Sequence, residues 1–142
     1  MTAPGGLLPD TNAVAAVMED TDEGQDYRSL VEGRLVAVSF ITVGELLYGA
    51  GKANWGPDRR AVLDDALRRF VAIPHDHQVA AAFARIRCGA GVLRQPIPYP
   101  DLWIAACAVR HGLPTITDDI AHFSRVEGLV VLPLRGRSIA IP

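Results

Sequence analysis

Short apolar runs alternate along the chain with longer segments in which apolar residues recur at helical spacing. The first apolar run, Leu7-Leu8, leads through Pro9 into Asp10, and an apolar segment at residues 13–18 follows almost at once. A short apolar run bounded by turn residues predicts a buried strand, and an Asp directly after it is well suited to begin a helix. We therefore predict a strand that ends at Asp10 and a helix directly after it.

The same pattern in the rest of the chain predicts further strands and helices. The predicted strands cover residues 35–39, 71–74, 114–117 and 129–132. The predicted helices cover residues 25–32, 42–50, 58–70, 77–88, 101–111 and 118–123, the last being a short helix or turn. Residues 95–100 contain three prolines and are predicted to be extended, because proline is excluded from helix interiors.

Strands that alternate with helices predict an α/β fold with a parallel sheet. We expect a central sheet of about four or five short parallel strands, flanked by helices on both of its faces. The sequence has no internal repeat and no linker that would divide it. Residues 1–142 are therefore expected to form a single domain, as is usual for a chain of this length.

Four acidic residues stand where strands end or helices begin. Asp10 and Asp119 follow predicted strands, whereas Glu45 and Asp101 lie at the starts of predicted helices. These positions converge at the carboxyl edge of a parallel sheet, which is where open α/β sheets bind their ligands. Asp118 is the alternative fourth acid, because we expect only one of two adjacent carboxylates to point into the site.

Each of these acids also has an ordinary structural explanation. Asp10 would cap the helix after it, and Asp118-Asp119 would cap the later short helix. Thr42–Glu45 fits a capping box, in which the Glu carboxylate binds backbone N–H groups at the helix start. Asp101 would place a negative charge at the positive end of a helix. The conjunction of all four positions, rather than any one of them, favours a site.

Four carboxylates brought together are costly to bury unless they are protonated or bind a cation. Oxygen ligands select hard cations, so Mg²⁺ is the expected cofactor and Mn²⁺ the alternative. Thr11 and Asn12, next to the first acid, are expected to orient its carboxylate and hydrogen-bond to it. His75 and His77 form an isolated pair, which fits a loop at a helix start better than a metal site.

Charge is unevenly distributed along the chain. The formal net charge of −2 gives no overall positive field for nucleic acid. Five acids lie between Glu19 and Asp26, and setting these and the four candidate acids aside leaves 7 of the 16 acids against 14 basic residues. All of the basic residues except Lys52 are arginine, which suits bidentate contacts to phosphate. A basic surface around an acidic cleft is therefore an expectation.

Cys88 and Cys107 make neither a metal motif nor a disulfide framework, and Cys107 is expected in the core. This use of cysteine fits a reducing cytoplasm. The first residues lack the pattern of a secretory signal, and no apolar run approaches the roughly 20 residues that a membrane span needs. We therefore expect a cytoplasmic protein without a membrane segment.

Four blocks of sequence together resemble the PIN domain, and more closely the VapC-type toxins within that family. The blocks are Asp10-Thr11-Asn12, then TVGELLYGA at residues 42–50, DLWIAACA at residues 101–108 with His111-Gly112, and Thr117-Asp118-Asp119 followed by Phe123. The first block alone would be a weak signal, but the order and spacing of all four cover nearly the whole chain.

This resemblance implies a compact α/β fold, an acidic Mg²⁺ site and cleavage of RNA. The acids of the family fall on Asp10, Glu45, Asp101 and Asp119 (or Asp118), with Thr11, Asn12 and Thr117 in support. The resemblance also implies a small DNA-binding antitoxin that blocks the cleft, and a homodimer. The expected mechanism is metal-dependent hydrolysis of RNA phosphodiesters, with Asp10 and Asp101 holding the principal Mg²⁺.

One departure from the family pattern is Pro9, which stands where an aliphatic residue is more usual; we expect a shortened strand and an intact site. Two other classes fit poorly. A response-regulator receiver needs a Lys after a late strand, and a haloacid dehalogenase-type phosphatase needs an Asp where Asn12 stands. The alternative that stays open is a PIN-like protein that binds RNA or a partner without cleaving it.

Overall fold

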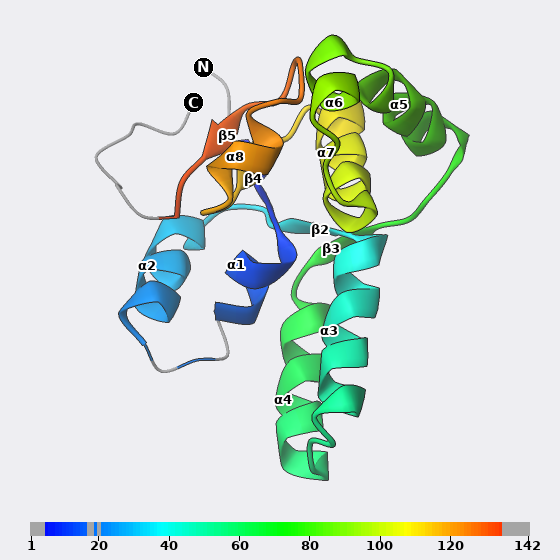
Figure 1. The fold of residues 1–142 in the computed structure, drawn as a ribbon. Coiled ribbons are helices and arrows are strands. Elements are labelled where there is room, and N and C mark those ends of the chain that lie inside the picture. Colours follow the sequence, from blue (N-terminus) through cyan, green and yellow to red (C-terminus); the bar gives the residue numbers. More distant parts are fainter. Residues whose placement is uncertain (1–4, 17–18, 20, 135–142) are drawn as a thin grey trace.

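The computed structural model describes residues 5–16, 19 and 21–134 of the chain, and in this part short strands alternate with helices (Figure 1). The strands are β1 (Leu8–Pro9), β2 (Ala37–Ser39), β3 (Val71–Ile73), β4 (Thr115–Ile116) and β5 (Val131–Leu132). The helices are α1 (Thr11–Ala16), α2 (Asp22–Val31), α3 (Phe40–Lys52), α4 (Pro57–Arg68), α5 (His77–Arg87), α6 (Ala90–Arg94), α7 (Tyr99–His111) and α8 (Ile120–Phe123).

These strands pair in parallel. β4 lies between β1 and β5, and β2 pairs with β3. One isolated parallel bridge, between Leu7 and Val36, joins the two groups, so the order across the sheet is β3-β2-β1-β4-β5. The predicted parallel sheet of short strands is confirmed, and β1 lies at its centre.

Pro9 explains why few backbone hydrogen bonds join β1 to β2. Leu7 N donates to Leu35 O, and Ala37 N donates to Leu7 O, both at 2.9 Å. Parallel strands bond through alternate residues, so the next donor from β1 toward β2 would be the N–H at position 9, which proline lacks. β1 is therefore short, as its proline predicted, and a seam separates it from β2.

The two faces of β1 belong to different apolar cores. Leu8 packs in the larger core, with residues of β2, β3 and helices α5 to α8. Leu7 packs in the smaller core, with Ala13 of α1 and Tyr27 of α2. Successive strand residues point to opposite faces, so the apolar pair Leu7-Leu8 requires cover on both sides of the sheet. The prediction of helices on both faces is confirmed (Figure 1).

α3 begins earlier than its pattern predicted. Ser39, the last residue of β2, is the N-cap, and its Oγ accepts a hydrogen bond from Ile41 N at 3.2 Å. The helix therefore starts at Phe40 rather than at Thr42. This shift matters for the site because it moves Glu45 away from the helix start.

α7 also begins early, at Tyr99 rather than at Asp101, because Pro100 fits in the first turn of a helix, where its missing N–H has no intrahelical partner to lose. The prediction of an extended chain was therefore wrong for the last two residues of 95–100. α2 starts three residues before its predicted start, and α6 was not predicted. The last two residues of the first predicted helix, 17 and 18, lie outside the described residues.

α3 and α4 project from the sheet as a two-helix arm (Figure 1). At its tip, the guanidinium of Arg59 lies 3.9 Å from the centre of the Trp55 ring, and Arg60 donates to the carbonyl oxygens of Trp55 and Ala50. Arg125, near α8, likewise donates to two backbone carbonyl oxygens. These arginines bind the protein itself, so they are poor candidates for the basic surface that the composition predicted.

Cys107 is buried in the larger core, as predicted, and Cys88 is exposed; both are free thiols. Among the described residues, none of the helices has the length and apolar character that a membrane crossing requires.

Two helical glycines should respond in opposite ways to alanine. A Cβ at Gly24, in α2, would collide with the carbonyl oxygens of Ala16 and Glu19, whereas a Cβ at Gly49, in α3, would meet nothing within 4 Å. We expect Gly24→Ala to lower the free energy of unfolding by about 1–3 kcal/mol. Gly49→Ala should raise it by about 0.5–1 kcal/mol, because alanine loses less backbone entropy in a helix.

Urea denaturation of the two variants beside the unmodified protein measures both changes. A Gly24→Ala protein as stable as the unmodified protein would contradict the close approach of α2 to the end of α1.

Candidate active site and metal centre

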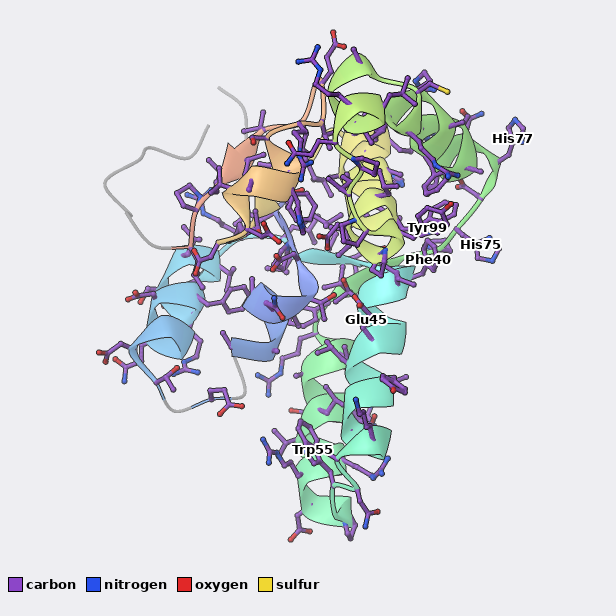
Figure 2. All side chains as sticks on the ribbon, viewed as in Figure 1. Phe40, Glu45, Trp55, His75, His77 and Tyr99 are labelled. Atoms are coloured by element: carbon purple, nitrogen blue, oxygen red, sulfur yellow. The ribbon has the colours of Figure 1, made fainter. Side chains whose placement is uncertain are left out.

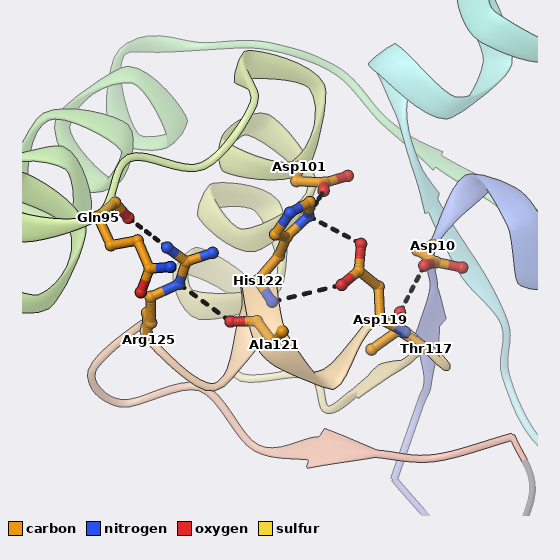
Figure 3. A network of polar contacts seen from close by, with 8 residues as sticks. All are labelled: Asp10, Gln95, Asp101, Thr117, Asp119, Ala121, His122 and Arg125. Carbon is orange, nitrogen blue, oxygen red and sulfur yellow. Dashed lines mark hydrogen bonds and ion pairs between the residues drawn. The ribbon is translucent and has the colours of Figure 1, made fainter.

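Asp10 stands at the carboxyl end of β1 and is only 5% exposed. Its Oδ1 accepts a hydrogen bond from Ala13 N at 2.8 Å, so the predicted cap on α1 is present. Its Oδ2 accepts a hydrogen bond from Thr117 Oγ1 at 2.6 Å, as Figure 3 shows. The same carboxylate therefore begins a helix and ties β1 to the residue after β4.

Thr117 connects Asp10 with a second acid. Its side chain is fully buried, and its Oγ1, besides donating to Asp10, accepts a hydrogen bond from Asp119 N at 2.8 Å. The backbone N–H of Thr117 donates to Leu132 O in β5 at 3.0 Å. One hydroxyl, held by the sheet, thus fixes the position of Asp119 relative to the carboxylate of Asp10.

Asp101 and Asp119 meet at the ring of His122 (Figure 3). Nδ1 of His122 lies 2.7 Å from Asp101 Oδ2 and 2.8 Å from Asp119 Oδ2. Asp101 comes from the first turn of α7, while Asp119 is the N-cap of α8 and His122 lies in that helix. The structure therefore brings together two of the predicted acids from segments that are far apart in sequence.

Glu45 joins the site through a hydroxyl group. Because α3 begins at Phe40, Glu45 lies in its second turn, and the predicted capping box with Thr42 is not formed. Thr11 Oγ1 instead donates to Glu45 Oε1 at 2.6 Å, and it lies 3.1 Å from Thr42 Oγ1. Thr11 was predicted to orient the carboxylate of Asp10, but its hydroxyl donates to Glu45 instead.

Asp118 and Asn12 are exposed beside the buried acid. Both border a small cavity of about 40 Å³ that is also lined by Asp10, Ala13, Asp119 and Leu134. The carboxylate of Asp119 reaches His122, whereas Asp118 contributes to the wall of this cavity. Asp119 therefore meets Asp101 at the His122 ring, while Asp118 lies at the border of the site.

Burial raises the pKa of the Asp10 carboxyl above its ordinary value, because it disfavours the charged form. The hydrogen bonds from Thr117 and from Ala13 N oppose this rise, and the negative charges of Asp101 and Asp119 add to it. No Lys or Arg among the described residues forms an ion pair with any of the four acids. Apart from His122, these four acids therefore lack a basic ion-pair partner in the described part of the chain, and a bound cation would supply positive charge.

His122 was not predicted as a site residue. It follows Asp119 by three positions on a helix of four residues, so its ring returns toward the capping carboxylate. The spacing Asp-x-x-His at a helix start is the signal that identifies it in the sequence. The pair His75 and His77 belongs to the start of α5, where Asp76 is the N-cap, as predicted.

The donor atoms fit a divalent cation. Asp101, Asp119 and His122 each present one ligand atom, and these atoms all lie within 4.8 Å of one another. Carboxylate oxygens suit the predicted Mg²⁺ or Mn²⁺. The imidazole nitrogen departs from the set of oxygen ligands that the sequence predicted.

A family model described as the PIN domain matches residues 7–129. Ribonuclease VapC2 of Haemophilus influenzae is 34% identical over 94 residues, which are 66% of this chain and 71% of that protein. The tRNA(fMet)-specific endonuclease VapC of Salmonella typhimurium is 29% identical over 124 residues, which are 87% and 93% of the two chains. The crystal structure of DNA-bound VapBC from Salmonella typhimurium has a TM-score of 0.80 at 25% identity, over 92% of this chain and 98% of that chain.

Thr117 and Thr115 provide a matched test of the site geometry, because both are fully buried and lie two positions apart. Thr117 Oγ1 bonds to Asp10 and Asp119, whereas Thr115 Oγ1 has no hydrogen-bond partner in the described part of the chain. Thr117→Val should lower the free energy of unfolding by about 1.5–3 kcal/mol, because it leaves one oxygen of the buried Asp10 carboxylate, Oδ2, without its donor. Thr115→Val should be neutral or stabilising by up to about 1 kcal/mol.

Urea denaturation of both variants at neutral pH makes the comparison. Equal losses of stability would show that the Thr117 hydroxyl does not hold the Asp10 carboxylate.

Proposed function

Since the chain belongs to the PIN domain family, we propose that it is a metal-dependent endoribonuclease, the toxin of a toxin–antitoxin pair. The observation that carries this proposal is the convergence of Asp10, Asp101 and Asp119 at one edge of the sheet, where no Lys or Arg of the described residues pairs with them and His122 lies between two of them. The names of the relatives, ribonuclease and endonuclease, support the same reaction class.

Asp10 and Asp101 would hold the principal Mg²⁺, with Asp119 and Glu45 supporting it directly or through water; Mn²⁺ is the alternative ion. When bound, such an ion supplies Lewis-acid chemistry, because it neutralises charge on a phosphate oxygen and makes water more acidic. Carboxylates alone repel a phosphate backbone, so the acids need this partner before RNA can approach. A cluster of acids thereby becomes a site for an anionic substrate.

The residues around the acids have the task of holding them in place. Thr117 and the N–H of Ala13 fix both oxygens of Asp10, so its orientation does not depend on solvent. Thr11 holds Glu45 on the arm at 2.6 Å, and Thr117 holds the backbone of Asp119. Such preorganisation lowers the cost of bringing water and phosphate into line for hydrolysis.

A small antitoxin protein is the proposed partner. Structural relatives are VapBC complexes, including the DNA-bound complex from Salmonella typhimurium. We infer that this chain pairs with a similar protein that covers the acidic site, and that two copies of the chain form a homodimer. RNA is the proposed substrate, and its sequence is to be found by experiment.

Cleavage of a mixed RNA pool tests the proposal. The protein, free of any partner, should cut RNA with Mg²⁺ present and should not cut it with EDTA. Asp10→Asn should reduce cleavage by at least about 10²-fold, because it removes the central carboxylate. Asp64→Asn, which neutralises an exposed acid on α4, is the matched control and should cleave normally. Full activity in a folded Asp10→Asn protein would contradict the assignment.

The same variant should remain folded. Burial disfavours the charge on Asp10, and the charges of Asp101 and Asp119 disfavour it further, so its removal relieves a cost. In EDTA at neutral pH, the melting temperature of Asp10→Asn should equal or exceed that of the unmodified protein, by up to about 4 °C for roughly 1 kcal/mol.

Added Mg²⁺ should then raise the melting temperature of the unmodified protein and have little effect on Asp10→Asn. Metal stabilisation without any cleavage would support the alternative of a PIN-like binding protein.

A further inference from the structure

The ring of His122 lies between two acids of the site. Its Nδ1 is 2.7 Å from Asp101 Oδ2 and 2.8 Å from Asp119 Oδ2 (Figure 3). The oxygens of an ionised carboxylate only accept hydrogen bonds, so Nδ1 carries the hydrogen and donates it. The backbone N–H of His122 also donates to Asp119 Oδ1, at 3.4 Å. One residue thus contacts both oxygens of Asp119 and one oxygen of Asp101.

The backbone that carries this ring is held at both ends of α8. Phe123, the residue after His122, is fully buried and packs in the larger core. Asp119, at the other end of this helix of four residues, donates from its N–H to Thr117 Oγ1 at 2.8 Å. The position of the ring between the carboxylates therefore follows from the sheet and the core, and the ring itself adopts the rotamer that meets both of them.

The two oxygens that the ring contacts converge on one point. The ligand atoms of Asp101, Asp119 and His122 all lie within 4.8 Å of one another. An ion bound by Asp101 Oδ2 and Asp119 Oδ2 together would lie against the Nδ1–H group, whose hydrogen carries a partial positive charge. The ring and an ion between these two oxygens therefore exclude each other.

The acids offer positions for two ions, and the ring fills one of them. In two-metal phosphodiester chemistry, ions about 3.5–4 Å apart stabilise the attacking and the leaving oxygen. The first position lies between Asp10 and Asp101, which are close enough for the charge of Asp101 to raise the pKa of the Asp10 carboxyl. The second lies between Asp101 and Asp119, where the Nδ1–H group stands. The ring leaves Oδ1 of Asp101 for the first position.

We propose that His122 takes the place of a second metal ion, so that the site binds one divalent cation, held by Asp10 and Asp101. The inference rests on the proposed function, since it specifies how many ions the metal centre takes. His122 is then a positioning residue, whose N–H holds Asp101 and Asp119 together without an ion between them. Hydrogen bonds of this length to a carboxylate are among the stronger ones in proteins.

The competing role for His122 is that of a metal ligand. Binding an ion through Nδ1 would remove its hydrogen and break the contacts with both carboxylates. Nε2 lies on the far side of the ring from these oxygens, so an ion bound there would not share them. Mg²⁺ also prefers oxygen ligands, whereas imidazole suits Zn²⁺, Cu²⁺ and Ni²⁺. These arguments favour a hydrogen-bond donor over a ligand.

Manganese binding tests the proposal without RNA. Mn²⁺ is the probe, and electron paramagnetic resonance of the ion that stays free gives the number of ions bound per chain. The unmodified protein should bind one Mn²⁺ tightly. His122→Ala should bind a second ion at least about ten-fold more tightly than the unmodified protein does. Its spectrum should show coupling between two neighbouring Mn²⁺ ions, which a merely structural effect of the substitution would not produce.

Two further variants separate the N–H group from the loss of a histidine. His122→Asn is the conservative variant, because the side-chain amide of asparagine carries N–H donors that can reach the position of Nδ1. His77→Ala is the matched control: His77 is exposed at the start of α5, and Figure 2 shows it at the edge of the molecule, apart from Glu45. Both variants should bind one Mn²⁺, like the unmodified protein.

Two tightly bound Mn²⁺ ions in the unmodified protein, or only one in a folded His122→Ala protein, would overturn the proposal. A nitrogen coupling to the bound Mn²⁺ that disappears in His122→Ala would also overturn it, because it would identify the ring as a ligand. If His122→Ala does not fold, the ion count of the unmodified protein and of His122→Asn, with the nitrogen coupling, still decides.

A separate cleavage assay distinguishes failure of this inference from failure of the proposed function. Cleavage of RNA by a protein that holds two ions would refute the role of His122 and leave the nuclease supported. One bound ion with the expected response of the variants, but no cleavage, would refute the enzyme and leave the role of His122 supported. A protein that binds no Mn²⁺ would overturn both.

Discussion

Asp10 is held almost entirely out of water at the end of β1, and its two carboxylate oxygens accept hydrogen bonds from two different elements. One oxygen begins α1, and the other binds the hydroxyl of Thr117 after β4. That hydroxyl fixes Asp119, whose carboxylate reaches His122 and, through its ring, Asp101. A single polar network thus joins the ends of β1 and β4 with the helices α1, α7 and α8, and the arrangement of the site depends on the buried carboxylate of Asp10.

The alternation of strands and helices predicted the fold well because each segment carries its own signal. The adjacent apolar residues Leu7 and Leu8 already require cover on both faces of a sheet, and the two cores supply it. The structural and the functional explanation of Asp10 are compatible, since its carboxylate caps α1 while it stands among other acids. Local patterns therefore located the acids without deciding between these roles.

Where local patterns failed, a neighbouring residue decided the outcome. Thr42–Glu45 matches a capping box, but Ser39 begins the helix first and frees Glu45 to bind Thr11. Pro100 looks like the end of an extended segment, yet it fits in the first turn of α7. His122 lies in a helix too short to show periodicity, and its role depends on Asp101, which is 21 residues away in sequence.

The seam at Pro9, between β1 and β2, separates Glu45 from Asp10 and Asp119. Glu45 belongs to α3, which continues from β2, while Asp10 and Asp119 follow β1 and β4 on the other side. In the described part of the chain the backbone crosses the seam at one bridge, and side-chain packing and the contacts of Thr11 with Glu45 and Thr42 also connect its two sides. Ladders fix the register of strands, whereas packed surfaces permit small sliding movements. Pro9 therefore makes the Thr11 hydroxyl, rather than a backbone ladder, the link that sets the position of Glu45 relative to the buried acid.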